Sequence, residues 1–97
     1  LKTLNGDELK PFANLTQLVI AENQNLEKIP GNLFDYNPMM ESIWFNSNKI
    51  KYVGDNLLKS LSHLRRADFS NNLCTNENAR DKTELGYLMT NLKSNCG

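Results

Sequence analysis

The amino-acid sequence predicts an α/β repeat fold in which similar units stack and end in a helical cap. One phrase, apolar-x-x-apolar-x-apolar-x-x-Asn, occurs over residues 15–23, 40–48 and 64–72. Its copies begin at residues 15, 40 and 64, and thus 25 and 24 residues apart. A fixed period of this size indicates repeated supersecondary units. After residue 72 the period stops, and the apolar spacing becomes that of an amphipathic helix.

Each phrase should contain one short strand. Apolar residues at its fourth and sixth positions alternate with polar ones, which is the pattern of a strand with one buried face. We therefore predict strands near 17–20, 42–45 and 66–69 that form a short parallel sheet on the concave side of the molecule. The inward-pointing residues of these strands are Leu18, Ile20, Ile43, Phe45, Ala67 and Phe69.

An asparagine ends every phrase, at Asn23, Asn48 and Asn72. Where the chain turns inward after a strand, backbone N–H and C=O groups become buried without partners in the sheet. A carboxamide offers two N–H donors and one oxygen acceptor, so one asparagine per unit can bridge successive units. We interpret these asparagines as structural residues rather than catalytic ones.

The phrase and its period resemble the leucine-rich repeat family, whose units carry L-x-x-L-x-L-x-x-N. The resemblance implies a right-handed solenoid over residues 1–73, an asparagine ladder, and a C-terminal cap over residues 74–97. The repeat register extends back to the first residue without a polar end unit, so we expect the chain to be a fragment of a longer repeat protein. The alternative is a native open end that the protein tolerates or covers by dimerisation.

The cap should contain one helix near 83–93. Asp81 and Glu84 are spaced as a capping box at its start, although Gly86 weakens the helix. The apolar face at i, i+3, i+4 and i+7 consists of Leu85, Leu88, Met89 and Leu92.

Two cysteines, Cys74 and Cys96, lie beyond the last phrase. Such a pair can form a disulfide, remain as two thiols, or supply half of a metal site. A metal site is disfavoured because the chain has one histidine and no Cys-x-x-Cys spacing. We favour the disulfide, and with it an oxidising, extracellular compartment. The cap also resembles those of secreted animal leucine-rich repeat proteins, particularly short insect ones, which implies a role such as innate-immune recognition.

Composition and motifs argue against several function classes. The chain carries 11 basic and 11 acidic side chains, so it lacks the positive charge typical of nucleic-acid binders. No apolar run approaches the roughly 18 residues that predict membrane insertion. Glycine-rich phosphate loops and nucleophile motifs are absent, and His63 stands alone. We therefore expect a non-enzymatic protein with no catalytic residues, metal or cofactor.

The outward positions of the strands form the predicted binding face, with Trp44 at its centre. Tryptophan and arginine are enriched at binding hot spots, so Arg65 and Arg66 are candidate second anchors. Alternatively, Trp44 packs flat over Val19 and the Arg66 stem, and Arg65 forms an exposed ion pair with Glu41. The predicted ligand-binding residues are Gln17, Val19, Glu41, Ser42, Trp44, Asn46, Arg65, Arg66 and Asp68.

These observations favour a secreted module that binds a protein, or another macromolecule, through the concave sheet. One alternative is an inhibitor of a secreted enzyme that uses the same face. Another is a structural module that self-associates through an exposed apolar rim of Leu1, Leu4, Leu9 and Phe12. The sequon Asn14-Leu15-Thr16 predicts a glycan on Asn14, unless the motif is a coincidence in which Leu15 is simply a core residue.

Overall fold

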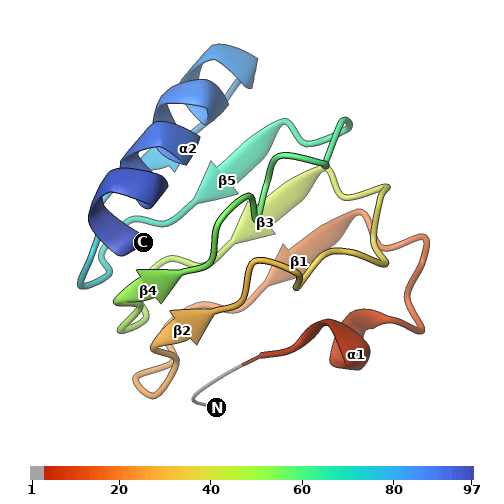
Figure 1. Cartoon of the computed structure of the whole chain (residues 1–97), viewed down its shortest axis with the longest axis horizontal. Coiled ribbons are helices and arrows are strands. Elements are labelled where there is room, and N and C mark those ends of the chain that lie inside the picture. The colour runs from red at the N-terminus through yellow and green to blue at the C-terminus, as the bar shows by residue number, and fades with distance from the viewer. Residues whose placement is uncertain (1–3) are drawn as a thin grey trace.

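Three of the four strands in the main sheet come from the repeated phrase. A computed structural model describes residues 4–97 (Figure 1). The strands β1 (Gln17–Val19), β3 (Ser42–Trp44) and β5 (Arg66–Asp68) run parallel in the order β1-β3-β5. Their register pairs Leu18 with Ile43 and Ile43 with Ala67, so residues at the same place in the phrase lie side by side.

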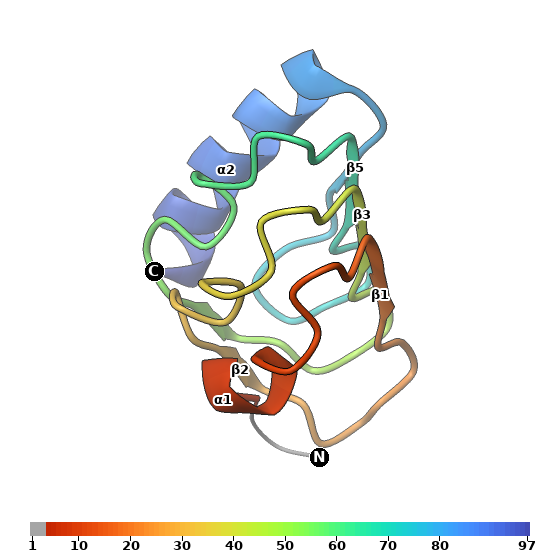
Figure 2. The ribbon, with the colours of Figure 1, turned by 90° about the vertical axis from the view of Figure 1, so that its right-hand side faces the viewer.

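The remaining elements surround this parallel core. A fourth strand, β6 (Asn78–Ala79), pairs antiparallel with β5, and the helix α2 (Lys82–Cys96) follows it. A second sheet pairs β2 (Lys28–Ile29) in parallel with β4 (Tyr52–Val53). Figure 2 shows the strands of the main sheet on one side of the molecule and β2 on the other.

The predicted repeat solenoid is wrong. The chain forms a compact α/β unit whose extents are 30 × 30 × 20 Å, so it is no longer than it is wide. The main sheet is mixed rather than parallel, because the chain reverses into β6 after the third phrase and pairs there with the edge of β5. Three phrases are too few to produce an elongated body once β6 and α2 close one end of it.

The core lies between the two sheets. Ile43, Phe45, Ala67 and Phe69 are at most 1% exposed, whereas the corresponding Leu18 and Ile20 of the first phrase are half-buried. The difference arises because β1 is the edge strand of the sheet. Three aromatic rings continue the stacking through the interior: the Phe34 and Phe45 centroids lie 6.3 Å apart, and those of Phe45 and Phe69 lie 5.5 Å apart in an edge-on contact.

A short helix, α1 (Gly6–Leu9), changes the predicted apolar rim. The Asn5 side chain accepts from the Glu8 N–H at 3.2 Å, and the Glu8 carboxylate accepts from the Asn5 N–H at 2.9 Å. This capping box folds Leu9 inward, so Leu4 and Leu9 are 7% and 9% exposed. The prediction of a rim formed by these leucines is therefore wrong. Of its members, Phe12 is exposed and Leu1 lies outside the described residues.

Helix α2 covers one end of the main sheet. Asp81 begins it and accepts from the Glu84 N–H at 2.8 Å. The Glu84 carboxylate accepts from the Arg80 N–H instead of closing on Asp81, so the predicted capping box is only half formed. The side chains that α2 buries are Leu85, Leu88, Leu92 and Cys96. Within residues 4–97, neither helix combines the length and apolar character needed to cross a bilayer.

The predicted disulfide between Cys74 and Cys96 is confirmed. It joins the segment after the last phrase to the end of α2, with a Cα–Cα distance of 5.3 Å. An intramolecular disulfide is typical of proteins from an oxidising compartment.

Alanine substitutions at two glycines are expected to change the stability of the protein in opposite directions. A Cβ atom on Gly54 would overlap the backbone nitrogen of Gly31, because successive segments pack backbone against backbone beside β4. We expect Gly54→Ala to lower the free energy of unfolding by about 1–3 kcal/mol, measured by urea denaturation. Gly86 in α2 has no heavy atom within 4 Å of such a Cβ, so Gly86→Ala should raise that free energy by about 1 kcal/mol. If both variants changed the free energy of unfolding in the same direction, this explanation would be contradicted.

Candidate binding face on the main sheet

The outward side chains of β1, β3 and β5 form two aligned rows. One row consists of Gln17, Ser42 and Arg66, and the other of Val19, Trp44 and Asp68. We call the sheet face the surface made by these rows and the flanking polar residues. Its members are Gln17, Val19, Glu41, Ser42, Trp44, Asn46, Arg65, Arg66 and Asp68. The strand register aligns six of the nine residues that the sequence predicts for ligand binding, and Glu41, Asn46 and Arg65 lie just beyond the strand ends.

The row through Trp44 changes from apolar to polar. Val19 at the sheet edge is 58% exposed, and Trp44 beside it is half-buried. On the other side of Trp44, the Asp68 carboxylate accepts from the Ser70 N–H at 2.9 Å and is thereby held in a local turn. The indole thus lies between a free apolar side chain and an oriented carboxylate.

Arg65 and Arg66 are both exposed beside this row. Their backbone N–H groups donate to the Glu41 carbonyl at 2.9 and 3.2 Å, which fixes where their side chains start. Within residues 4–97, ion pairs join Lys51 to Glu27 and Arg80 to Glu84, so the alternative Arg65–Glu41 pair does not form. Both guanidinium groups are consequently available to a partner.

The sheet face is anchored at one end by Asn48, which is 4% exposed. Its Nδ2 donates to the carbonyls of Ile20 and Phe45, each at 2.8 Å, and its Oδ1 accepts from the Asn23 N–H at 2.8 Å. Asn48 therefore ties the first phrase to the second through two backbone groups, the Ile20 carbonyl and the Asn23 N–H. By contrast, the Asn23 side chain accepts only from the nearby Asn25 N–H, at 3.1 Å, among the described residues.

Asn72 connects the second phrase to the third in the same way. Its Nδ2 donates to Phe45 and Phe69 carbonyls at 3.0 and 2.9 Å, and its Oδ1 accepts from the N–H groups of Asn48 and Ile50 at 3.1 and 3.2 Å. These bonds hold the carboxyl ends of β3 and β5 in fixed relative positions.

A polar hollow of about 330 Å³, which the sequence did not predict, adjoins these asparagines. The residue before each ladder asparagine lines it, and all three have left-handed backbone, with φ of 56° at Glu22, 61° at Ser47 and 59° at Asn71. The Asn71 amide donates to the Ser47 hydroxyl at 3.3 Å. The one sequence feature that relates to this hollow is the polar residue at the eighth position of every phrase. Polarity alone does not predict a concave surface, so the hollow could not be predicted from it.

Asn37 is a second structural asparagine that the sequence did not single out. Fully buried, it donates through Nδ2 to the Leu9 and Phe12 carbonyls, each at 2.9 Å. It therefore connects α1 to the segment after β2. Its position before Pro38 is typical of a turn, which hid this role.

Asn14 is exposed in the turn before β1, as is Thr16 of its sequon. A glycan can therefore be attached there without displacing core side chains, and glycosylation stays a prediction. His63 is also exposed. Residues 4–97 contain no group of three metal-ligating side chains close enough to share an ion.

Comparison with known proteins does not assign the chain to a family. No family model matches the sequence, and no curated protein matches it.

Proposed function

We propose that this protein is a non-enzymatic module that binds another protein through the sheet face. The observation that carries the proposal is the aligned row of Val19 and Trp44, with two arginines beside it that form no ion pair within the described residues. Tryptophan and arginine dominate the binding energy of protein interfaces, especially near the centre of the contact. A partner with an apolar side chain next to a carboxylate would match Val19, Trp44 and the arginines together.

The rigidity of the sheet face supports the same proposal. Hydrogen bonds from Asn48 and Asn72 fix the ends of the strands that carry Trp44 and Arg66. A preorganised surface loses little conformational entropy on binding, so more of the contact energy appears as affinity. Since the face spans three neighbouring strands about 4.8 Å apart, it contacts a short segment of the partner rather than a broad surface.

We further propose that the protein acts outside the cell. The Cys74–Cys96 disulfide supports an oxidising compartment, and the exposed Asn14 sequon suits a secreted glycoprotein. An innate-immune role rests only on the resemblance of the C-terminal cap to those of short secreted insect proteins.

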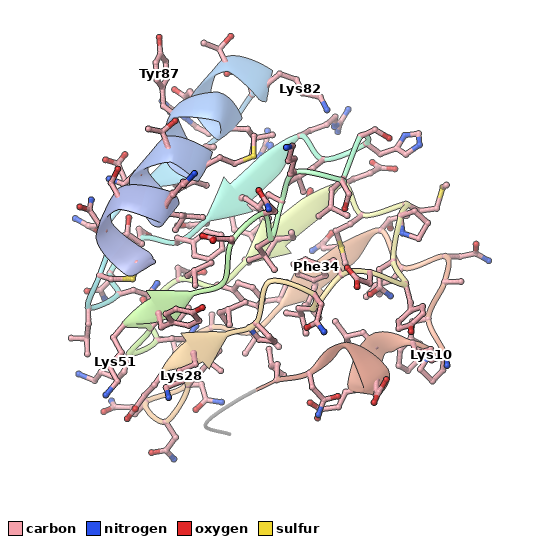
Figure 3. All side chains as sticks on the ribbon, in the orientation of Figure 1. Lys10, Lys28, Phe34, Lys51, Lys82 and Tyr87 are labelled. Carbon is pink, nitrogen blue, oxygen red and sulfur yellow. A yellow bond between two sulfur atoms is a disulfide. The ribbon has the colours of Figure 1, made fainter. Side chains whose placement is uncertain are left out.

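Replacing Trp44 with alanine tests the proposed face. Immobilised wild type is used to capture a partner from the native extracellular fluid, and the affinity of the captured protein is then measured for each variant. We expect Trp44→Ala to weaken binding by about 2 kcal/mol or more, which is roughly 30-fold, because a central anchor is removed. The matched control is Tyr87→Ala, since Tyr87 is 73% exposed on α2 and points away from the sheet (Figure 3).

Equal affinities of the Trp44 and Tyr87 variants would contradict the proposal. Urea denaturation of each variant shows whether a loss of binding reflects a loss of folding. Arg65→Gln and Arg66→Gln, which keep most of each side chain, should weaken binding less than Trp44→Ala and reduce its dependence on salt.

A further inference from the structure

A cleft of about 370 Å³ lies between α2 and the turn after β4. Figure 2 shows this turn, in green, running alongside the helix. The volume falls at the lower end of the range for small-molecule sites. The apolar residues that line the cleft are Val53, Leu57, Leu58, Met89 and Leu92. No residue of the sheet face contributes to it, so the cleft is a separate feature of the molecule.

Gly86 leaves the helix side of the cleft open. It lies inside α2 and lines the cleft, and a Cβ atom built on it would meet no heavy atom within 4 Å. Met89, on the same helix, is 38% exposed although its spacing matches the buried leucines. The absent side chain at Gly86 therefore leaves apolar surface on Met89 accessible from solvent.

The rim of the cleft is positively charged. Lys59 and Lys93 are exposed lining residues, and Asp55 is the one acidic residue that lines it. None of the three belongs to either ion pair among residues 4–97. The Thr90 hydroxyl already donates to the Gly86 carbonyl at 3.2 Å, so the side-chain donors left for a ligand are the two ammonium groups and the Asn56 amide.

We propose that this cleft binds a single-chain amphipathic carboxylate. Its hydrocarbon chain lies against Leu57, Leu58 and Met89, and its carboxylate lies between Lys59 and Lys93. Apolar lining surface favours burial of the chain, while the net positive rim favours an anionic head over a neutral or cationic one. The small volume suits one medium-length chain rather than a two-chain lipid.

Titration with decanoate, followed by backbone amide NMR shifts, tests this proposal. We expect saturable binding with a Kd on the order of 0.1–1 mM, as for a small ligand of modest efficiency. The shifts should concentrate at residues 53–59 and 86–93. Acetate has the head without the chain, and decyltrimethylammonium has the chain with the opposite charge, so both should bind at least about tenfold more weakly.

Variants separate the chain contact from the charge contact. Gly86→Leu places a side chain in the open space and should weaken decanoate binding at least about tenfold, whereas Gly86→Ala should change it little. Replacing both Lys59 and Lys93 with glutamine should weaken binding about fivefold and remove most of its salt dependence. Replacing both Lys10 and Lys28 with glutamine is the charge-matched control, because Lys10 lies at the end of α1 and Lys28 on β2, both away from α2 (Figure 3).

Three results would overturn the proposal. The first is equal affinity for decanoate and decyltrimethylammonium, and the second is equal decanoate affinity of the Gly86→Leu and Gly86→Ala variants. The third is a set of amide shifts that falls outside the cleft. Because Gly86 is exposed and leucine favours helices, urea denaturation should show that both Gly86 variants stay folded.

Discussion

Asn48→Ala should lower the free energy of unfolding by at least about 2 kcal/mol, because it leaves two backbone groups without partners at about 1–3 kcal/mol each. The groups are the Ile20 carbonyl and the Asn23 N–H, whereas the Phe45 carbonyl keeps its bond from Asn72 Nδ2. With Asn48 only 4% exposed, water has little access to replace these bonds. A loss of this size is a large share of the roughly 5–15 kcal/mol that stabilises a typical domain.

Asn23→Ala is the matched control for this prediction. It removes the same side chain from the same place in the phrase, but the bond lost is a local one to the Asn25 N–H. We expect a loss below about 1 kcal/mol, since that group is exposed to water. Urea denaturation followed by circular dichroism compares the two variants. If their midpoints were equal, the bonds of Asn48 to the first phrase would not be what stabilises the fold.

Asn48→Asp distinguishes hydrogen bonding from packing. The carboxylate keeps the volume of the amide and can still accept from the Asn23 N–H, but it places oxygen against the Ile20 and Phe45 carbonyls. It should therefore destabilise the protein at neutral pH at least as much as alanine does. A wild-type stability of this variant would indicate that shape, and not donor capacity, matters at this position.

Local structure in the repeated segments could be predicted from the sequence. Alternation of apolar and polar residues places each strand, and the repeat period aligns Leu18, Ile43 and Ala67 across the sheet. These features depend on residues close in the sequence and on the pairing of each strand with the strand of the next phrase. The repeated phrase determines both.

The overall fold class could not be predicted, because it depends on how the last phrase is closed. The two residues of β6 lie in a polar stretch and are too few to show alternation. They pair because the edge of β5 offers unpaired backbone groups, as in the bond from the Phe69 N–H to the Glu77 carbonyl at 2.9 Å. Helix α1 escaped detection for a similar reason, since four residues are too short for helical periodicity.

Of the two candidate sites, the sheet face could be predicted in part from the sequence and the cleft could not. Alternation alone places Val19 and Trp44 on the sheet face, but how far each is exposed depends on its neighbours in space. The cleft beside Gly86 has no sequence signature, since its volume is set by the distance between α2 and the turn after β4. From the sequence alone, the only effect expected of Gly86 is a lower stability of the helix.

The second large effect is expected at the disulfide, where replacing both Cys74 and Cys96 with serine should cost about 3 kcal/mol of stability. The bond spans a sequence separation of 22 residues, and the chain-entropy model assigns about 3 kcal/mol to closing a loop of this length. The loop contains β6 and nearly all of α2, so the cross-link keeps the helix close to β5 in the unfolded chain.

Reducing the Cys74–Cys96 disulfide of the wild type provides an independent measurement of the stability that this bond contributes. Urea midpoints with and without reductant should differ by as much as those of the wild type and the double serine variant, while the variant should not respond to reductant. Hydrogen exchange should also show the amides of α2 losing protection before those of β3, because the helix packs on β4, β5 and β6 at one end of the molecule, whereas β3 lies inside the main sheet. If reductant left the wild-type midpoint unchanged, the attachment of α2 would depend on its buried face of Leu85, Leu88 and Leu92, and not on the cross-link.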